Sequence, residues 1–165
     1  MNINEAIKFL LKEIKDPAVG LPEEIFEFIT KITPIINVDL LIKDKRGRTL
    51  LSWRDDDLHG KGWHVPGGIV RFREKFEERI KMVAKLEIGY PDLIFDSSPI
   101  TITQIINKER DIRGHFISLL YRCFIPDDFI PDNRNLSSND NGYLKWHNKC
   151  PEDLLMVQEI YRKYI

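Results

Sequence analysis

Cysteine is scarce in this sequence, neither sign of charge is in excess, and long apolar runs are missing. The two cysteines among the 165 residues are too few for the disulfide framework of a small secreted domain. The net charge of −1 gives no basic excess, which argues against nucleic acid and anionic membranes as partners. No apolar run approaches the roughly 20 residues that a membrane span needs. We therefore expect a cytoplasmic protein with one domain.

The first 33 residues carry two amphipathic helical patterns. Residues 3–15 repeat apolar side chains at helical spacing with acids among them, which is typical of an amphipathic helix and not of a signal peptide. Residues 22–32 repeat the pattern after Pro22 and two glutamates, as the start of a helix prefers. We expect a two-helix extension over residues 1–33 that packs on the same domain, and its apolar face is a candidate surface for a homodimer.

Residues 34–165 alternate between β-branched runs, turns and two further helical patterns. The strand-like runs, in chain order, are a hairpin over 35–54, short strands at 63–66 and 69–72, longer strands at 93–106 and 115–125, and a last strand at 143–146. Helices are predicted over 74–87 and 152–164. Helices on both sides of a mixed sheet make a layered domain, so we expect a single α/β domain, an α/β/α sandwich, over residues 34–165.

A glycine pair followed by spaced acids stands near the middle of the chain, in the stretch WHVPGGIVRFREKFEERIKMVAKLEIGY. Gly67 and Gly68 let the backbone pass close to a ligand and adopt conformations that other residues avoid. Five residues separate Gly68 from Glu74, and Glu87 and Gly89 follow where a second acid and a helix-ending glycine belong. This frame resembles the box of the Nudix hydrolases, which is G, five residues, E, seven residues and then R-E-apolar-x-E-E-x-G-apolar.

The chain keeps the spacing of the Nudix box and departs from its residues at three positions. The positions that fit are Gly68, Glu74, Ala84, Glu87, Gly89 and Tyr90, with Tyr90 counted as apolar. Met82, Val83 and Leu86 stand where the family has an arginine and two glutamates. The resemblance implies the Nudix fold and the hydrolysis of a nucleoside diphosphate derivative, with Mg²⁺ or else Mn²⁺ as the cofactor.

The acids that remain in the box predict a reduced metal site. Val83, Leu86 and Glu87 are spaced by three and four residues, which predicts that they stack on one face of the helix. Three carboxylates there would hold more than one divalent cation, and here only Glu87 remains. Glu87 and the carbonyl oxygen of Gly67 are the predicted ligands of a single Mg²⁺. Glu74 is a further candidate ligand, or else a charge that stabilises the start of the helix.

The altered box is similar to that of one branch of the family, the GDP-mannose mannosyl hydrolases. The resemblance implies a single metal and attack at the anomeric carbon of a nucleotide sugar, with a free sugar and a nucleoside diphosphate as products. The hairpin PIINVDLLIKDKRGRTLLSWR resembles the entry hairpin of that branch, which places Asp39 near the sugar and Arg54 on phosphate. His115 lies in GHFISLLYRC, which resembles a late strand of the branch, and is a further candidate for the substrate site.

One departure from that branch lies directly after the glycine pair. Ile69 replaces an arginine, and Arg71, two residues later, points to the same face of a strand. A guanidinium presents a fixed fork of donors that matches phosphate oxygens. We therefore predict that Arg54 and Arg71 both bind phosphate and assist catalysis.

A second departure concerns the general base. The histidine that serves as base in that branch aligns with Asn141, which cannot take up a proton near neutral pH and is left as a substrate ligand. The metal-binding glutamine before it aligns with Asp140, which is therefore predicted as a metal ligand or as the base itself. His115 and His147 are the other candidates for the base.

Three functions remain open from the sequence. The first is hydrolysis of a nucleotide sugar at the sugar–phosphate bond, and the second is hydrolysis of the diphosphate in the same class of substrate. The third is a nucleotide-binding module without catalysis, which the missing base and the reduced number of carboxylates motivate. No motif identifies the nucleobase or the sugar.

Overall fold

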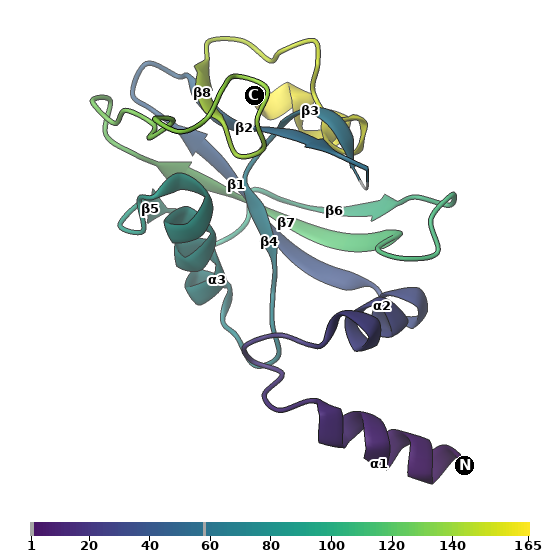
Figure 1. Cartoon of the computed structure of the whole chain (residues 1–165). Coiled ribbons are helices and arrows are strands. Elements are labelled where there is room, and N and C mark those ends of the chain that lie inside the picture. Colours follow the sequence, from purple (N-terminus) through teal and green to yellow (C-terminus); the bar gives the residue numbers. More distant parts are fainter. Residues whose placement is uncertain (1, 58) are drawn as a thin grey trace.

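The structure, a computed structural model, describes residues 2–57 and 59–165, so the predictions for Met1 and Leu58 lie outside the described residues. The described residues form one sheet of eight strands with helices on both of its faces (Figure 1). The strands are β1 (Ile35–Lys43), β2 (Thr49–Asp56), β3 (Gly60–His64), β4 (Gly67–Ile69), β5 (Ile94–Phe95), β6 (Thr101–Ile106), β7 (His115–Phe124) and β8 (Leu144–His147). β1 and β7 pair in parallel and the other pairs are antiparallel, which confirms the predicted α/β class with a mixed sheet.

Strand β1 lies near the centre of the sheet and has two antiparallel partners along one of its edges. β4 pairs with its first half, where Val38 lies opposite Gly68 and Asp39 lies opposite Gly67. β2 pairs with its end, and β7 pairs with its other edge along the whole strand. This arrangement places the glycine pair directly beside Asp39.

Two hydrophobic clusters cover the two faces of the sheet. Successive side chains of a strand point to opposite faces, so Leu40 packs in one cluster and Leu41 in the other. The helix α3 (Phe76–Val83) and the π-helical turn η1 (Ala84–Ile88) cover the first face. The 3₁₀-helix η2 (Met156–Tyr164) covers the second face through Tyr161. These three layers correspond to the predicted sandwich.

The last helix is shorter than predicted. The prediction began it at residue 152, whereas η2 begins at Met156 and is a 3₁₀-helix. The backbone before it is extended because it pairs with β3. Trp63 donates a backbone hydrogen bond to Asp153 and accepts one from Leu155, both at 2.8 Å.

Two predicted strands are also interrupted. The long strand at 93–106 is split into β5 and β6, because Pro99 between them has no N–H to donate to a neighbouring strand. The strand predicted at 69–72 ends early: β4 stops at Ile69, and only Val70 beyond it donates a further backbone hydrogen bond, to Ile36 at 3.0 Å. Arg73 adopts a left-handed conformation with φ of 60°, which turns the chain toward α3.

The N-terminal extension consists of α1 (Ile3–Glu13) and α2 (Glu23–Ile32). α1 projects away from the sheet and buries none of its residues (Figure 1). α2 lies against the β6–β7 loop, where Thr30 Oγ1 accepts a hydrogen bond from the backbone of Arg113 at 3.2 Å. The division at residue 33 and a homodimer through the extension stay predictions. Among the described helices, none has the length and hydropathy of a membrane-spanning segment.

Candidate functional site

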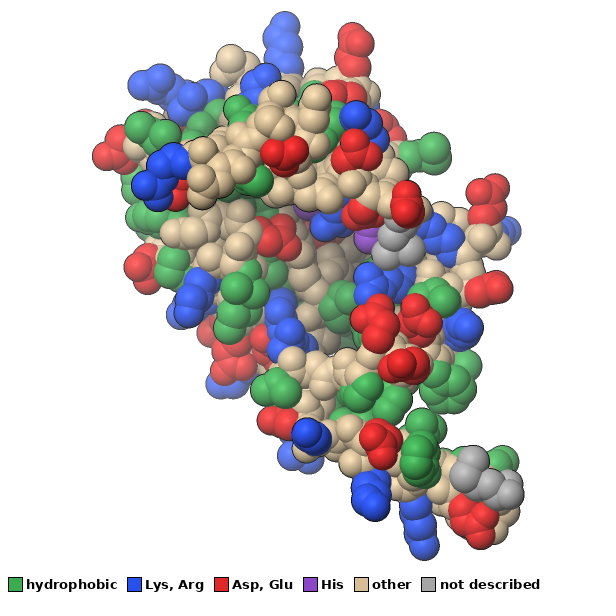
Figure 2. All heavy atoms as spheres, viewed as in Figure 1, with side chains coloured by type: hydrophobic (Ala, Val, Ile, Leu, Met, Phe, Trp, Pro, Cys, Tyr) green, Lys and Arg blue, Asp and Glu red, His purple; other side chains and the backbone are tan. Residues whose placement is uncertain are grey.

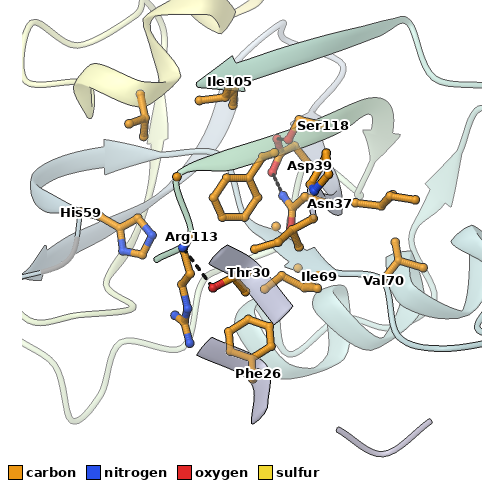
Figure 3. Close-up of a pocket in the computed structure, with 18 of the residues that line it drawn as sticks. Phe26, Thr30, Asn37, Asp39, His59, Ile69, Val70, Ile105, Arg113 and Ser118 are labelled. Carbon is orange, nitrogen blue, oxygen red and sulfur yellow. Dashed lines mark hydrogen bonds between the residues drawn. The ribbon is translucent and has the colours of Figure 1, made fainter. Parts of the chain in front are cut away.

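A cavity of about 710 Å³ opens between α2, the sheet and the C-terminal segment. Figure 2 shows it as a hollow near the middle of the surface with histidine and basic side chains at its rim, and Figure 3 shows its interior. The lining comes from α2, the first half of β1, β4, the start of β7, the β2–β3 and β6–β7 loops and the start of η2. The glycine pair lies in its wall, and a large concave site of this kind is where a ligand is expected.

Glu87 lies at the end of the box helix, next to the glycine turn. The α-helix stops at Val83, and the chain continues as the π-helical turn η1, in which Glu87 lies. Burial raises the pKa of the Glu87 carboxyl to about 7, although Arg54 and a backbone hydrogen bond from Gly67 oppose the shift. The structure therefore brings together Glu87 and Gly67, which the sequence predicts as ligands of one metal ion.

The prediction that positions 83, 86 and 87 share one helix face was wrong for position 86. Val83 is 3% exposed and packs in the core over Gly68, whereas Leu86 is 71% exposed. A π-helical turn has a wider hydrogen-bonding pattern than an α-helix and so changes the spacing of its side chains. In this conformation Val83 contributes to the core over Gly68, and Leu86 is exposed to solvent.

Close packing, and not backbone conformation, requires the two glycines. Neither has a φ in the left-handed region. A methyl group on Gly67 would overlap the Asp39 carboxylate and lie 3.0 Å from the Val38 carbonyl oxygen. A methyl group on Gly68 would lie 2.7 Å from Val83 Cγ2. The first glycine therefore lets β4 lie against Asp39, and the second lets α3 lie against β4.

Asp39 is buried in the wall of the cavity, and three donors hold its carboxylate. Tyr161 Oη and Ser118 Oγ donate to Oδ2 at 2.7 Å each, and Asn37 Nδ2 donates to Oδ1 at 2.6 Å. Figure 3 shows Asn37, Asp39 and Ser118 gathered on one side of the cavity. Burial raises the pKa of Asp39 to about 6, while these hydrogen bonds and Arg54 oppose the rise. The donors fix the orientation of this acid.

Arg54 and Arg71 both line the cavity. Arg54 is half-buried near the end of β2, and its charge lowers the pKa values of both Glu87 and His59. The positive charge of Arg54 therefore acts on both of these ionisable groups. The guanidinium of Arg71 donates a hydrogen bond to the backbone carbonyl of Val19, which ties the extension to the rim of the cavity.

Glu74 lies outside the cavity lining and is held by an arginine. Its Oε2 accepts hydrogen bonds from Arg79 Nε at 2.8 Å and from the backbone N–H of Arg71 at 2.9 Å. Both side chains of the Glu74–Arg79 ion pair are largely shielded from solvent. Arg79 thus supplies the cationic partner that the box lacks at Met82. These contacts support the interpretation that Glu74 stabilises the start of the helix and is not a metal ligand.

Asp140, Asn141 and His115 do not line the cavity. Asp140 is exposed and accepts a backbone hydrogen bond within its own turn. The Asn141 amide bonds both backbone groups of Asp55, which attaches the loop before β8 to the end of β2. His115 Nε2 lies 2.8 Å from Gln104 Nε2. The structure does not bring these three side chains together with Glu87, because their contacts hold them elsewhere.

The cavity has a second wall that the sequence did not predict, formed by α2 and the β6–β7 loop. The guanidinium of Arg113 lies over the Phe26 ring, 4.7 Å from its centroid, and 3.6 Å from the Glu23 carboxylate. Arg110 and His59 also line the cavity. Arg110 and Arg113 both belong to the charged stretch NKERDIRG. Its charge was the only feature of the sequence that could have indicated a ligand-binding role. No local pattern relates that stretch to α2.

The oxygen donors around Glu87 fit one hard divalent cation. Mg²⁺ is bound in proteins through one or two carboxylates together with substrate phosphates and water. The Glu87 carboxylate and the Gly67 carbonyl oxygen are donors of this kind. Within residues 2–57 and 59–165, no group of three or more His, Cys, Asp or Glu side chains forms a metal cluster. The donor set therefore fits a single Mg²⁺ or Mn²⁺ and does not fit a multi-metal centre.

Comparison with known proteins identifies the fold. No family model matches the sequence. The chain is 28% identical over 116 residues to the low-salt glycan biosynthesis protein Agl8 of Haloferax volcanii, covering 68% of this chain and 72% of that protein. The solved structure of a MutT NUDIX hydrolase from Burkholderia pseudomallei is similar with a TM-score of 0.61 and 19% identity, covering 81% of this chain and 98% of that one. A possible asymmetric diadenosine tetraphosphate hydrolase from Jonesia denitrificans is similar with a TM-score of 0.60 and 17% identity, covering 81% and 92%. The chain therefore has the Nudix hydrolase fold.

Proposed function

We propose that the protein is a Mg²⁺-dependent hydrolase of a nucleoside diphosphate sugar, which it cleaves at the glycosyl–phosphate bond to a free sugar and a nucleoside diphosphate. The observation that carries this proposal is the backbone hydrogen bond from Gly67 to Glu87, because Gly67 lies in the wall of an arginine-lined cavity and Glu87 lies directly behind it. Positions 83 and 86 add no carboxylate, so the site supports one cation. When bound, that cation neutralises the diphosphate and makes it a better leaving group.

The lining of the cavity supports a substrate with a diphosphate and a less polar part. Arg54 offers a planar fork of donors for phosphate oxygens, and Arg71 and Arg110 add positive charge. Phe26 and Phe116 provide apolar surface for a ring. The cavity volume of about 710 Å³ lies within the usual range of small-molecule sites. GDP-mannose is the substrate that the sequence resemblance implies.

The similarity to a protein named for glycan biosynthesis supports the same substrate class, because glycans are built from activated sugars. A second candidate reaction is hydrolysis of the diphosphate itself. Asp39 lies beside Gly67 and raises the pKa of Glu87, so a second carboxylate stands near the metal ligands. A second carboxylate beside the metal ligands could hold a further cation or accept a proton from the water that attacks phosphorus.

Hydrolysis in ¹⁸O-labelled water separates the two reactions. We expect the label to enter the free sugar, because water attacks the anomeric carbon in the proposed reaction. Mass spectrometry of the products from GDP-mannose and related nucleotide sugars gives the position of the label. Label in a phosphate group would establish the pyrophosphatase reaction in its place.

The aromatic wall of the cavity makes a prediction about substrate binding. The Phe26→Ala variant is expected to raise KM about tenfold, which corresponds to the loss of roughly 1.4 kcal/mol of binding. The expected effect on kcat is small, since the Phe26 side chain on α2 can supply apolar surface to a ligand but no charge, proton or metal ligand. Phe28→Ala is the matched control, because Phe28 lies on the same helix, is 50% exposed and does not line the cavity. Equal KM values for both variants would contradict a substrate contact at Phe26.

A further inference from the structure

The β2–β3 turn holds a histidine against an aspartate at the edge of the cavity. Asp56 ends β2, and its Oδ1 accepts a hydrogen bond from the His59 backbone at 2.6 Å. The same oxygen lies 3.2 Å from His59 Nδ1. Arg54 Nε lies 3.4 Å from the other Asp56 oxygen. Partial burial works against ionisation of Asp56, but hydrogen bonds from the His59 backbone and ring and the charge of Arg54 oppose it, and the net pKa of Asp56 lies below its usual value.

This contact determines which nitrogen of His59 is available. An ionised carboxylate only accepts hydrogen bonds, so Nδ1 carries the proton that it donates to Asp56. In the neutral ring the lone pair is then on Nε2. His59 lines the cavity, and Figure 3 shows its ring pointing from the turn toward the interior. A neutral histidine held in this way presents a proton acceptor to the cavity.

The charges around His59 favour its neutral form. Burial lowers the pKa of His59, and the charges of Arg54 on β2 and Arg110 on the β6–β7 loop lower it further. Asp56 opposes this shift through its charge and hydrogen bond, and the net pKa lies below the usual value. Burial lowers the pKa of the neighbouring His64 on β3 to about 3. His64 is therefore neutral near neutral pH and adds no positive charge beside His59.

The other candidates for a base lie outside the cavity or are held by hydrogen bonds, and His147 is among those that do not line it. Asp140 and Asn141 make turn and loop contacts outside the cavity, and His115 contacts Gln104. Asp39 lines the cavity, but Tyr161, Ser118 and Asn37 already donate to both of its carboxylate oxygens.

We propose that His59 is the general base of the hydrolysis and that Asp56 positions its ring, an inference that rests on the function proposed above. Nε2 takes one proton from the attacking water while the water oxygen bonds to the anomeric carbon. The bond from that carbon to the phosphate oxygen breaks, and its electron pair leaves with the nucleoside diphosphate. A base in this position replaces the one that the loop before β8 lacks.

The test is the pH dependence of kcat for the 165-residue chain with a nucleotide sugar and Mg²⁺. General base catalysis contributes at least about 100-fold, so His59→Ala is expected to lower kcat by that factor with little change in KM. In the native protein kcat is expected to fall as the pH drops through the lowered pKa of His59, because the base becomes protonated. That acidic limb is expected to disappear in His59→Ala, and added imidazole is expected to restore part of kcat. Restoration by imidazole also shows that the variant is folded.

A pair of aspartate variants tests the positioning role. Asp56→Asn removes the charge that raises the pKa of His59, so the acidic limb is expected to move to lower pH while kcat falls. Asp57→Asn changes the neighbouring exposed acid and is expected to leave both the limb and kcat unchanged.

Two different results would overturn the proposals. If the native protein turns over and His59→Ala keeps its kcat and acidic limb, His59 is not the base, and a limb that disappears in a His147→Gln variant would assign the role there. If the native protein hydrolyses none of the nucleotide sugars, the proposed function fails and the assignment of the base fails with it.

Discussion

Replacing Glu87 with glutamine is expected to lower kcat by about 1000-fold, because the charge stabilisation by a bound metal is worth several kcal/mol and each 1.4 kcal/mol is a factor of ten. Glutamine keeps the shape of the side chain and loses its charge, which weakens its hold on Mg²⁺. The fold is expected to persist, since burial already favours the neutral form of this group. The measurement is kcat as a function of Mg²⁺ concentration, together with a thermal melt.

An acid on the same helix provides the control for this variant. Glu77 lies in the first turn of α3 and is exposed, so Glu77→Gln is expected to keep the turnover and the Mg²⁺ dependence of the native protein. A specific loss in Glu87→Gln excludes a module that binds nucleotides without catalysis. Native turnover in Glu87→Gln would show instead that the metal is held elsewhere.

Replacing Gly67 with alanine is expected to destabilise the protein by about 2 kcal/mol, within the usual cost of overpacking a tightly packed site. The added methyl group would meet the Asp39 carboxylate, which three donors hold in place, and the backbone carbonyl of Val38. The same displacement of β4 moves the Gly67 backbone away from Glu87, so turnover is expected to fall as well. Urea unfolding and the kcat of the folded variant measure the two effects.

Gly47→Ala separates these effects from the general cost of replacing a glycine. Gly47 has φ of +78° and open space around the added methyl group. Its replacement is expected to cost about 1 kcal/mol of backbone strain and to leave turnover unchanged. If Gly67→Ala were no more costly than Gly47→Ala, the close approach of β4 to Asp39 would not be a constraint.

The sequence by itself determined the fold class and the order of glycine turn, loop and helix between Gly67 and Glu87, because both depend on local patterns. Alternating apolar residues predict strands, and the spacing from Gly68 to Glu87 predicts a loop and one helix between two ligands. Gly89 has φ of 75°, the left-handed conformation expected of a glycine that ends a helix. The helix-face argument failed for Leu86 because it assumed an α-helix throughout, and no sequence pattern indicated the π-helical turn.

Only the tertiary structure decided which polar groups meet in the cavity. Tyr161 reaches Asp39 from 122 residues away, Asn141 bonds Asp55 from 86 residues away, and Arg113 bonds Thr30 across 83 residues. None of these contacts follows a helical or strand period. Each contact depends on how the sheet, the extension and the loops pack together. The same packing holds Asn141 in a loop outside the cavity and places His59 and Phe26 in the cavity lining.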